Sequence, residues 1–218
     1  MAENLYPDSH IEIRGFMAKH YDALLNICSL GLYKRFITDA VKRMDIRPDD
    51  HILDLGCGTG RNARLMADYL SSQGHITGMD FSEEMDEQFR RKFNNDDRVR
   101  FIRQRIDLMF DLDKLYDKVL ISFVIHGLPP DFRGTVIRNA YDHLKPGGRL
   151  CILDYSEFHI NTTPLFPRII LKTIEGRYAF DFIDRDWKKF LQEYGFDSFS
   201  EHFFIRDYVR LLTGQKTG

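Results

Sequence analysis

The sequence has few of the features that indicate an extracellular or membrane-spanning protein. Its three cysteines, at positions 28, 57 and 151, lie far apart and form no Cys-x-x-Cys pair. Neither a disulfide framework nor a zinc site is therefore expected. No apolar run approaches the roughly 20 residues that span a bilayer, and the N-terminus lacks the basic-then-apolar pattern of a signal peptide. These absences predict a cytoplasmic location and leave peripheral membrane contact open.

The sequence also lacks an excess of charge of one sign. Its formal net charge is −2, so we expect no nucleic acid partner. One stretch, Phe89–Arg105, is locally basic, and such runs usually form a solvated face. A polyanion or an anionic lipid surface is the alternative partner for this stretch. At 218 residues, without an internal repeat or a linker, the sequence predicts a single domain.

A glycine-rich stretch, His51–Ala63, organises the rest of the sequence. A short apolar strand ends in three alternate glycines, Gly56, Gly58 and Gly60, and a helical segment follows. Glycine lets the backbone approach a ligand closely, and a helix N-terminus offers unpaired N–H groups. This pattern predicts a ligand site, with an ordinary turn between two core elements as the alternative.

A second strand, predicted over 76–79, ends at Asp80. This residue follows Gly60 by 20 positions, a spacing that suits a carboxylate accepting hydrogen bonds from both hydroxyls of a ribose. A carboxylate that only caps the strand end is the alternative. Ser82 is predicted to cap the next helix.

The remaining pattern predicts an α/β fold. Helical periods over 11–28 and 33–44 precede the first strand, and further strands are predicted at 99–102, 119–125 and 150–153. A helix capped by Asp131 is expected to end at Lys145–Gly148, another begins at Asp184, and strands at 199–204 and 208–212 close the chain. The result is a doubly wound, mostly parallel, seven-stranded sheet with helices on both faces and a terminal antiparallel strand. One crevice at the carboxyl ends of the strands would be lined by Asp54, Gly56, Asp80, Asp107, His126 and Asp154.

Three motifs in this order, Asp54–Gly60, Gly78–Met85 and Leu144–Gly148, resemble those of the class I S-adenosylmethionine-dependent methyltransferases. The resemblance covers roughly residues 12–155. The N-terminal stretch around Phe16–Asp22 is similar to a narrower group, the C-methyltransferases of ubiquinone and menaquinone biosynthesis.

The resemblance implies S-adenosylmethionine as cofactor, with S-adenosylhomocysteine as product, and a set of cofactor-binding residues. The set comprises Tyr21, Asp54, Gly56, Cys57, Gly58, Gly60, Asp80, Phe81, Met85, Ile106, Asp107, Ser122 and Phe123. Asp80 would hold the ribose, Phe81 and Met85 would lie beside the adenine, and Tyr21 would close over the cofactor. One position departs from the pattern: Arg105 occupies the slot where the family has an acidic residue, so the adenine would rely on the N–H of Ile106 and on Asp107 or water.

The resemblance further implies one methyltransferase domain, with a helical lid over 1–47, a cofactor-binding core over 48–155 and a substrate-covering part over 156–218. Tyr21, His126 and Tyr155 are the expected acceptor-binding residues. His126 is the candidate general base because the pKa of an unperturbed imidazole lies near neutrality, and a purely structural histidine is the alternative. His143 and His159 show no metal-ligand spacing with it, so no metal is expected.

These features predict methyl transfer to a small apolar or aromatic acceptor, such as a quinol precursor or a lipid-like molecule. The alternatives are a non-catalytic S-adenosylmethionine-binding protein and an RNA or protein methyltransferase. A nicotinamide-dependent oxidoreductase is a remote alternative, because Gly58–Ala63 fits Gly-x-Gly-x-x-Ala. The oligomeric state is not indicated by any pattern in the sequence.

Overall fold

The computed structural model describes residues 32–159 and 177–218. The strands are β1 (His51–Leu55), β2 (His75–Asp80), β3 (Val99–Arg103), β4 (Tyr116–Ser122), β5 (Leu144–Tyr155), β6 (Phe196–Phe204) and β7 (Val209–Lys216). The helices are α2 (Leu32–Lys42), α3 (Arg61–Ala67), α4 (Glu83–Lys92), α5 (Pro130–Asp142), α7 (Tyr178–Asp184) and α8 (Trp187–Gln192), with a 3-10 turn, η1, at Ile125–Gly127.

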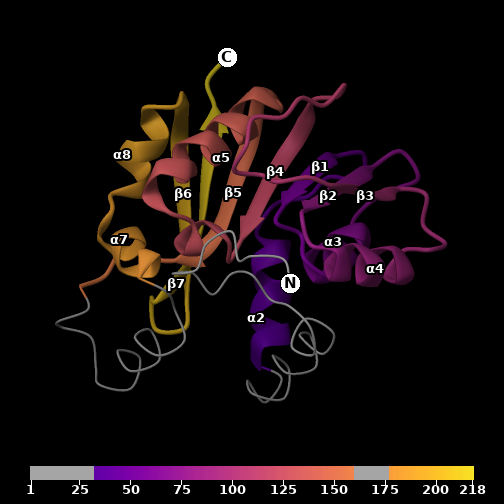
Figure 1. Ribbon diagram of the computed structural model, residues 1–218, viewed down its shortest axis with the longest axis horizontal. Helices are drawn as coiled ribbons and strands as arrows, with labels where there is room; N and C mark the ends of the chain where they lie inside the picture. Colours follow the sequence, from indigo (N-terminus) through magenta and orange to yellow (C-terminus); the bar gives the residue numbers. More distant parts are fainter. Residues whose placement is uncertain (1–31, 160–176) are drawn as a thin grey trace.

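The strands form one sheet in the order β3-β2-β1-β4-β5-β7-β6 (Figure 1). Strands β1 to β5 are parallel to one another, and β7 runs antiparallel to both β5 and β6. The predicted seven-stranded α/β sheet with a terminal antiparallel strand is thereby confirmed.

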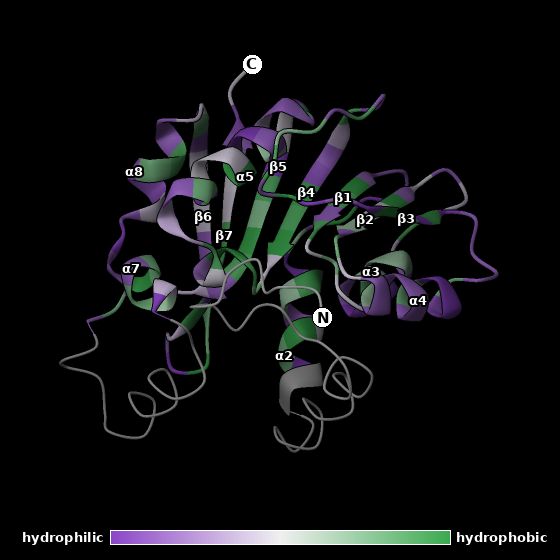
Figure 2. Cartoon of the chain, viewed as in Figure 1, coloured by the Kyte–Doolittle hydropathy of each residue, from purple (hydrophilic) through white to green (hydrophobic). Residues whose placement is uncertain are grey.

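Two hydrophobic clusters cover the two faces of the sheet. Successive side chains of a strand point to opposite faces, so Ile52 packs with α2, α3 and α4, whereas Leu53 packs with α5, α7 and α8. Burial on both faces explains the continuous apolar sequence of the central strands. In Figure 2 the lower parts of β4 and β5 are hydrophobic and α4 is largely hydrophilic.

The strand order reverses between β1 and β4, from which the chain continues to β2 on one side and to β5 on the other. Ligands of such sheets bind outside the carboxyl ends of the strands at this switch point. The arrowheads of β4 and β5 point toward α2, which lies at this end of the sheet (Figure 1).

Several predicted element ends differ from the structure. Strand β4 stops at Ser122 rather than at residue 125, because Phe123 adopts a φ of 55°. Helix α5 begins at Pro130 and is not capped by Asp131, since proline fits the first helical position and needs no N–H partner there. The cap of α8 is Asp186 rather than Asp184, and its side chain accepts the N–H of Lys189 at 3.0 Å.

The sequence indicated that a helix ends at Lys145–Gly148, but the structure shows otherwise. Helix α5 already stops at Asp142, and the four residues lie within β5. They interrupt its register with β4, where Tyr116 pairs with Leu144 but Lys118 pairs with Arg149. The stretch is therefore a bulge in the strand. The predicted Ser82 cap is confirmed: its hydroxyl accepts the N–H of Met85 at 3.3 Å.

In the described part of the chain, none of the helices has both the length and the hydropathy that a membrane crossing requires.

Candidate active site

The turn between β1 and α3 keeps all three glycines at positive φ, 75° at Gly56, 51° at Gly58 and 77° at Gly60. Packing requires two of them. A Cβ at Gly56 would lie 2.5 Å from the Val124 side chain, and one at Gly60 would lie 2.6 Å from Phe89. At Gly58 the nearest atom to an added Cβ is 4.0 Å away. The turn therefore leaves room beside Gly58, where a ligand can approach the backbone.

The Asp80 carboxylate lies directly against this turn. Its Oδ2 accepts the N–H of Gly58 at 3.0 Å, and its Oδ1 accepts the N–H of Ser82 at 3.0 Å. Each carboxylate oxygen retains capacity for a further donor. Burial raises the pKa of Asp80, against the lowering effect of these backbone hydrogen bonds. The strand end and the glycine turn thus meet as the 20-residue spacing suggested.

Asp54, on β1, is fully buried without a hydrogen bond to either carboxylate oxygen from the described residues. Burial, and secondarily the charge of Asp80, raise the pKa of Asp54 to about 7. A buried carboxylate without a partner is costly. A cationic or hydrogen-bond-donating ligand beside the glycine turn would supply the missing partner.

Three neighbouring residues named from the sequence differ in what they present. The Cys57 side chain is buried in the core, where burial raises the pKa of its thiol, and its N–H donates to the Met79 carbonyl at 3.1 Å. Cys57 therefore contributes its backbone rather than its thiol to the turn. Met85 is buried with its sulfur toward Gly58, and Phe81 is half-buried.

Arg105, in the position where the resemblance implies an acid, pairs with Asp107. Its Nε and Nη2 donate to Asp107 at 3.1 and 2.6 Å, which balances both charges. Asn139 of α5 fixes the backbone next to this pair. Its side-chain amide donates to the carbonyls of Ile106 and Leu108 at 2.9 and 2.8 Å. Sequence reasoning missed Asn139, since only its predicted helical position was visible.

An aromatic cluster, defined as Phe36, Phe123, Tyr155 and Phe204, lies at the carboxyl ends of β4 and β5. Phe123 follows the half-buried Ser122, and its strained backbone is held by the hydrogen bond from its N–H to the Leu153 carbonyl at 2.9 Å. Its ring meets Phe36 and Tyr155 edge-on, at centroid distances of 6.1 and 6.3 Å. Phe36 also contacts Phe204 at 5.0 Å. The sequence had not indicated that Phe36 and Phe204 join this site.

His126, in η1, is 5% exposed and bonded to Asp154 at the end of β5. The imidazole Nδ1 lies 2.7 Å from Asp154 Oδ1, and the ring centroid lies 5.1 Å from that of Tyr155. A carboxylate partner favours the tautomer with the proton on Nδ1, which places the basic lone pair on Nε2. The two residues are 28 positions apart, and their direct pairing was not evident from the sequence.

Some predicted residues lie elsewhere. Tyr21 and the aromatic stretch between 160 and 176 lie outside the described residues. His143 serves the fold: its Nε2 accepts the N–H of Leu112 at 3.0 Å. Within the ranges 32–159 and 177–218, no group of three or more His, Cys, Asp or Glu side chains is arranged to hold a metal.

The strand order, the glycine turn after β1 and the acidic end of β2 together define the class I methyltransferase fold. The family described as "Methyltransferase domain" matches residues 52–148. Residues 52–148 are therefore similar to a methyltransferase domain, which favours this class over the nicotinamide-dependent alternative.

Individual relatives agree. The chain is 33% identical over 143 residues to the demethylmenaquinone methyltransferase of Listeria welshimeri, covering 64% of this chain and 59% of the relative. It is 31% identical over 144 residues to that of Lactiplantibacillus plantarum, covering 65% and 60%. The chain thus spans about three fifths of the length of these curated relatives. The fold resembles that of human N-acetylserotonin methyltransferase, solved in complex with SAM, with a TM-score of 0.70, 16% identity and coverage of 92% of this chain and 56% of that one.

Proposed function

We propose that the protein transfers the methyl group of S-adenosylmethionine to a small apolar or aromatic acceptor. The observation that carries this proposal is the Asp80 carboxylate hydrogen-bonded to Gly58, in a turn with open space beside it. Asp54 lies close by and has no hydrogen-bond partner among the described residues, which supports the proposal. These residues fit a nucleoside that also carries positive charge.

The chain's own residues divide the work of holding this cofactor. Asp80 accepts the ribose hydroxyls, and Asp54 provides negative charge toward the amino acid portion. Phe81 and Met85 flank the adenine, with the N–H of Ile106 and the Arg105–Asp107 pair at its edge. Ser122 and Phe123 lie toward the amino acid end, and an aromatic face favours a nearby cation. When bound, the cofactor supplies an electrophilic methyl group on a sulfonium.

The aromatic cluster supports an apolar, flat acceptor. Phe36 belongs to α2, within the predicted lid over 1–47, and it contacts the end of β4 from that side. The similarity to demethylmenaquinone methyltransferases agrees with a quinol-like acceptor. We therefore place the acceptor ring between this cluster and His126.

The His126–Asp154 pair supplies a general base. Asp154 orients the imidazole through Nδ1, and Nε2 would take the proton that the acceptor loses. With the cofactor bound, the methyl group would pass from the sulfonium sulfur to the acceptor carbon or oxygen, and S-adenosylhomocysteine would leave. In-line displacement otherwise needs mainly proximity and alignment, which the rigid ends of β4 and β5 provide.

Titration calorimetry with S-adenosylhomocysteine, and transfer of labelled methyl from S-adenosylmethionine to a demethylated naphthoquinol, test this function. Asp80→Asn should weaken product binding by about 100-fold, since charge-assisted hydrogen bonds each contribute about 1.5–3 kcal/mol. The matched control, Asp113→Asn in the exposed loop before β4, should bind normally. Equal affinity of Asp80→Asn and the parent protein would overturn the cofactor site. Normal binding without methyl transfer to any acceptor would instead indicate a non-catalytic binder.

A further inference from the structure

A second cavity lies at the opposite, amino-terminal end of β1, β2 and β4. It has a volume of about 180 Å³ and is lined mainly by His51, His75, Thr77, Arg100, Lys114 and Tyr116. His51, His75 and Tyr116 are the first residues of their strands. Thr77 precedes Asp80 by three residues, about 10 Å along β2. The cavity is therefore distinct from the carboxyl-edge site.

The Arg100 guanidinium, which lines this cavity, is hydrogen-bonded to two hydroxyl groups. Arg100 donates from Nε to Thr77 Oγ1 at 2.9 Å and from Nη2 to the Tyr116 hydroxyl at 3.3 Å. The Tyr116 hydroxyl in turn donates to Thr77 Oγ1 at 3.1 Å. Thr77 and Tyr116 are buried, whereas Arg100 is exposed. The guanidinium is thus oriented by neutral partners, and it has five N–H donors in total, so donors remain for a ligand.

Positive groups dominate the lining. Within the described ranges, neither Arg100 nor Lys114 forms an ion pair with a carboxylate, and Asp97 is the one acidic residue of the lining. The rings of His51 and His75 stand edge to face with centroids 5.2 Å apart. Burial, followed by the charges of Lys145, His75 and Lys114, lowers the pKa of His51, while Asp117 opposes this change. The lining contains three cationic side chains, Arg98, Arg100 and Lys114, and one acidic side chain, Asp97.

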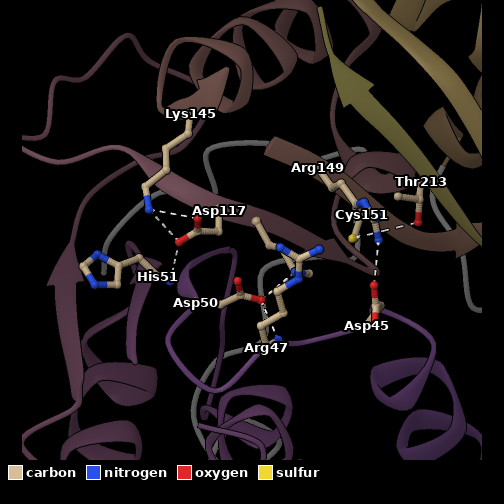
Figure 3. Close-up of polar contacts among 10 residues, drawn as sticks. Asp45, Arg47, Asp50, His51, Asp117, Lys145, Arg149, Cys151 and Thr213 are labelled. Carbon is tan, nitrogen blue, oxygen red and sulfur yellow. Dashed lines mark hydrogen bonds and ion pairs between the residues drawn. The ribbon is translucent and has the colours of Figure 1, made fainter. Parts of the chain in front are cut away.

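Two acidic residues next to the cavity, Asp117 and Asp96, are already engaged, whereas Asp97 lies exposed in the lining. Asp117 accepts the backbone N–H of His51 at 2.8 Å and the Lys145 ammonium at 2.8 Å. Figure 3 shows this arrangement, with the His51 ring directed away from the Asp117 carboxylate. Arg98, which also borders the cavity, is itself engaged by Asp96 at 2.7 Å and by the Leu70 carbonyl at 2.7 Å. Two lining cations, Arg100 and Lys114, therefore remain without a carboxylate partner among the described residues, and Asp97 is the one acidic side chain beside them.

We propose that this cavity binds a phosphate-type oxyanion, as inorganic phosphate or the phosphate group of a small monoester. A planar, pre-oriented guanidinium beside an ammonium suits tetrahedral oxyanions. The volume equals that of about six liquid waters, enough for a phosphoryl group and a few further atoms but too small for a nucleotide. This site is independent of the methyl-transfer proposal.

Calorimetric titration of the full chain with inorganic phosphate and with glycerol phosphate, in low-salt buffer free of other oxyanions, tests the proposal. We expect saturable binding of one ligand per chain. Arg100→Gln should weaken it by about tenfold or more, because a charge-assisted donor pair is lost. Arg103→Gln is the matched control: Arg103 lies on the same strand, is exposed and faces Glu83 at 3.4 Å. It should bind phosphate as the parent does.

Tyr116→Phe provides a second variant that keeps the buried ring and removes only the hydroxyl that supports Arg100. It should weaken phosphate binding several-fold while preserving the circular dichroism spectrum. Sedimentation with phosphatidic acid vesicles distinguishes the source of the oxyanion, since retention that Arg100→Gln abolishes would assign it to a lipid headgroup. Failure to saturate with either soluble phosphate or vesicles would overturn the proposal, as would equal losses in Arg100→Gln and Arg103→Gln.

Discussion

The two ends of the parallel strands have opposite chemistry. At the carboxyl ends lie Asp54, Asp80 and Asp154 with an aromatic cluster, whereas Arg100 and Lys114 border a polar cavity near the amino ends. In a parallel α/β sheet, helix N-termini point to the first end and helix C-termini to the second, so the helix dipoles favour this separation. Arg98 illustrates it by donating to the Leu70 carbonyl just after α3. Arg100 differs from Arg98, because its partners in the structure are the hydroxyl groups of Thr77 and Tyr116 rather than carbonyls at the end of a helix.

The largest expected effect separates the two ends by catalysis. His126→Ala should reduce kcat by about 100- to 10,000-fold, the range that general acid–base catalysis contributes. Arg100→Gln at the other end should leave kcat unchanged. Steady-state kinetics with labelled S-adenosylmethionine measures both variants. If Asp154 orients the imidazole, Asp154→Asn should lower kcat relative to the parent protein by a factor that becomes smaller at higher pH. Full activity of His126→Ala would exclude His126 as the general base.

Next in size is a pH-dependent stability effect at Asp54. Its folded-state pKa of about 7 lies above that of an unfolded aspartate, so the neutral carboxyl stabilises the fold at low pH. This stabilisation is lost as the pH rises through 7, at a cost of about 4 kcal/mol at most. Asp54→Asn should therefore gain stability relative to the ligand-free parent between pH 5 and pH 8, measured by denaturant unfolding. The cavity residue Asp97, changed to Asn, should show no such trend.

A smaller effect separates two glycines of the turn. Gly58→Ala should lose about 1 kcal/mol of stability from its positive φ, yet weaken S-adenosylhomocysteine binding by about tenfold or more because the methyl occupies the ligand's space. Gly56→Ala should cost more stability, since its Cβ meets Val124 at 2.5 Å. Thermal melts and calorimetry measure the two quantities. If the loss of S-adenosylhomocysteine affinity in both variants simply followed their loss of folding stability, the open space at Gly58 would have no role in binding.

The smallest expected effect is a test of independence. Asp80→Asn and Arg100→Gln lie at opposite ends of the sheet, and effects of distant sites usually add to within about 0.5 kcal/mol. The double variant should therefore lose S-adenosylhomocysteine affinity only as far as Asp80→Asn alone does. A larger interaction in calorimetry would show that the two ends communicate through β2.

Much of this architecture follows from local patterns. The glycine turn, the alternation of strands and helices and the spacing to Asp80 predicted the sheet and its ligand edge, because each depends on residues close in sequence. The exact caps did not follow: Asp184 and Asp186 are equally suitable by type, but Asp184 is the last residue of α7 and Asp186 caps α8. Likewise, α5 begins at Pro130, so Asp131 lies inside the helix and does not cap it.

Such local patterns do not predict contacts between residues that are far apart in the sequence. The His126–Asp154 pair and the Asn139 bridge to the loop after β3 depend on how β4, β5 and α5 are placed. The charge pattern of Phe89–Arg105 predicted a solvated face, but the residues of this stretch have different roles. Arg100 lies within β3 and borders the cavity, whereas Arg105 lies in the loop after β3 and pairs with Asp107.

Asp54 has one further consequence. With a pKa of about 7 it carries its proton in about half of the molecules at neutral pH. A cation bound beside it lowers that pKa, so each binding event releases a fraction of a proton to the solution. The heat of cofactor binding should therefore differ between Tris and PIPES, in proportion to the ionisation enthalpies of the two buffers.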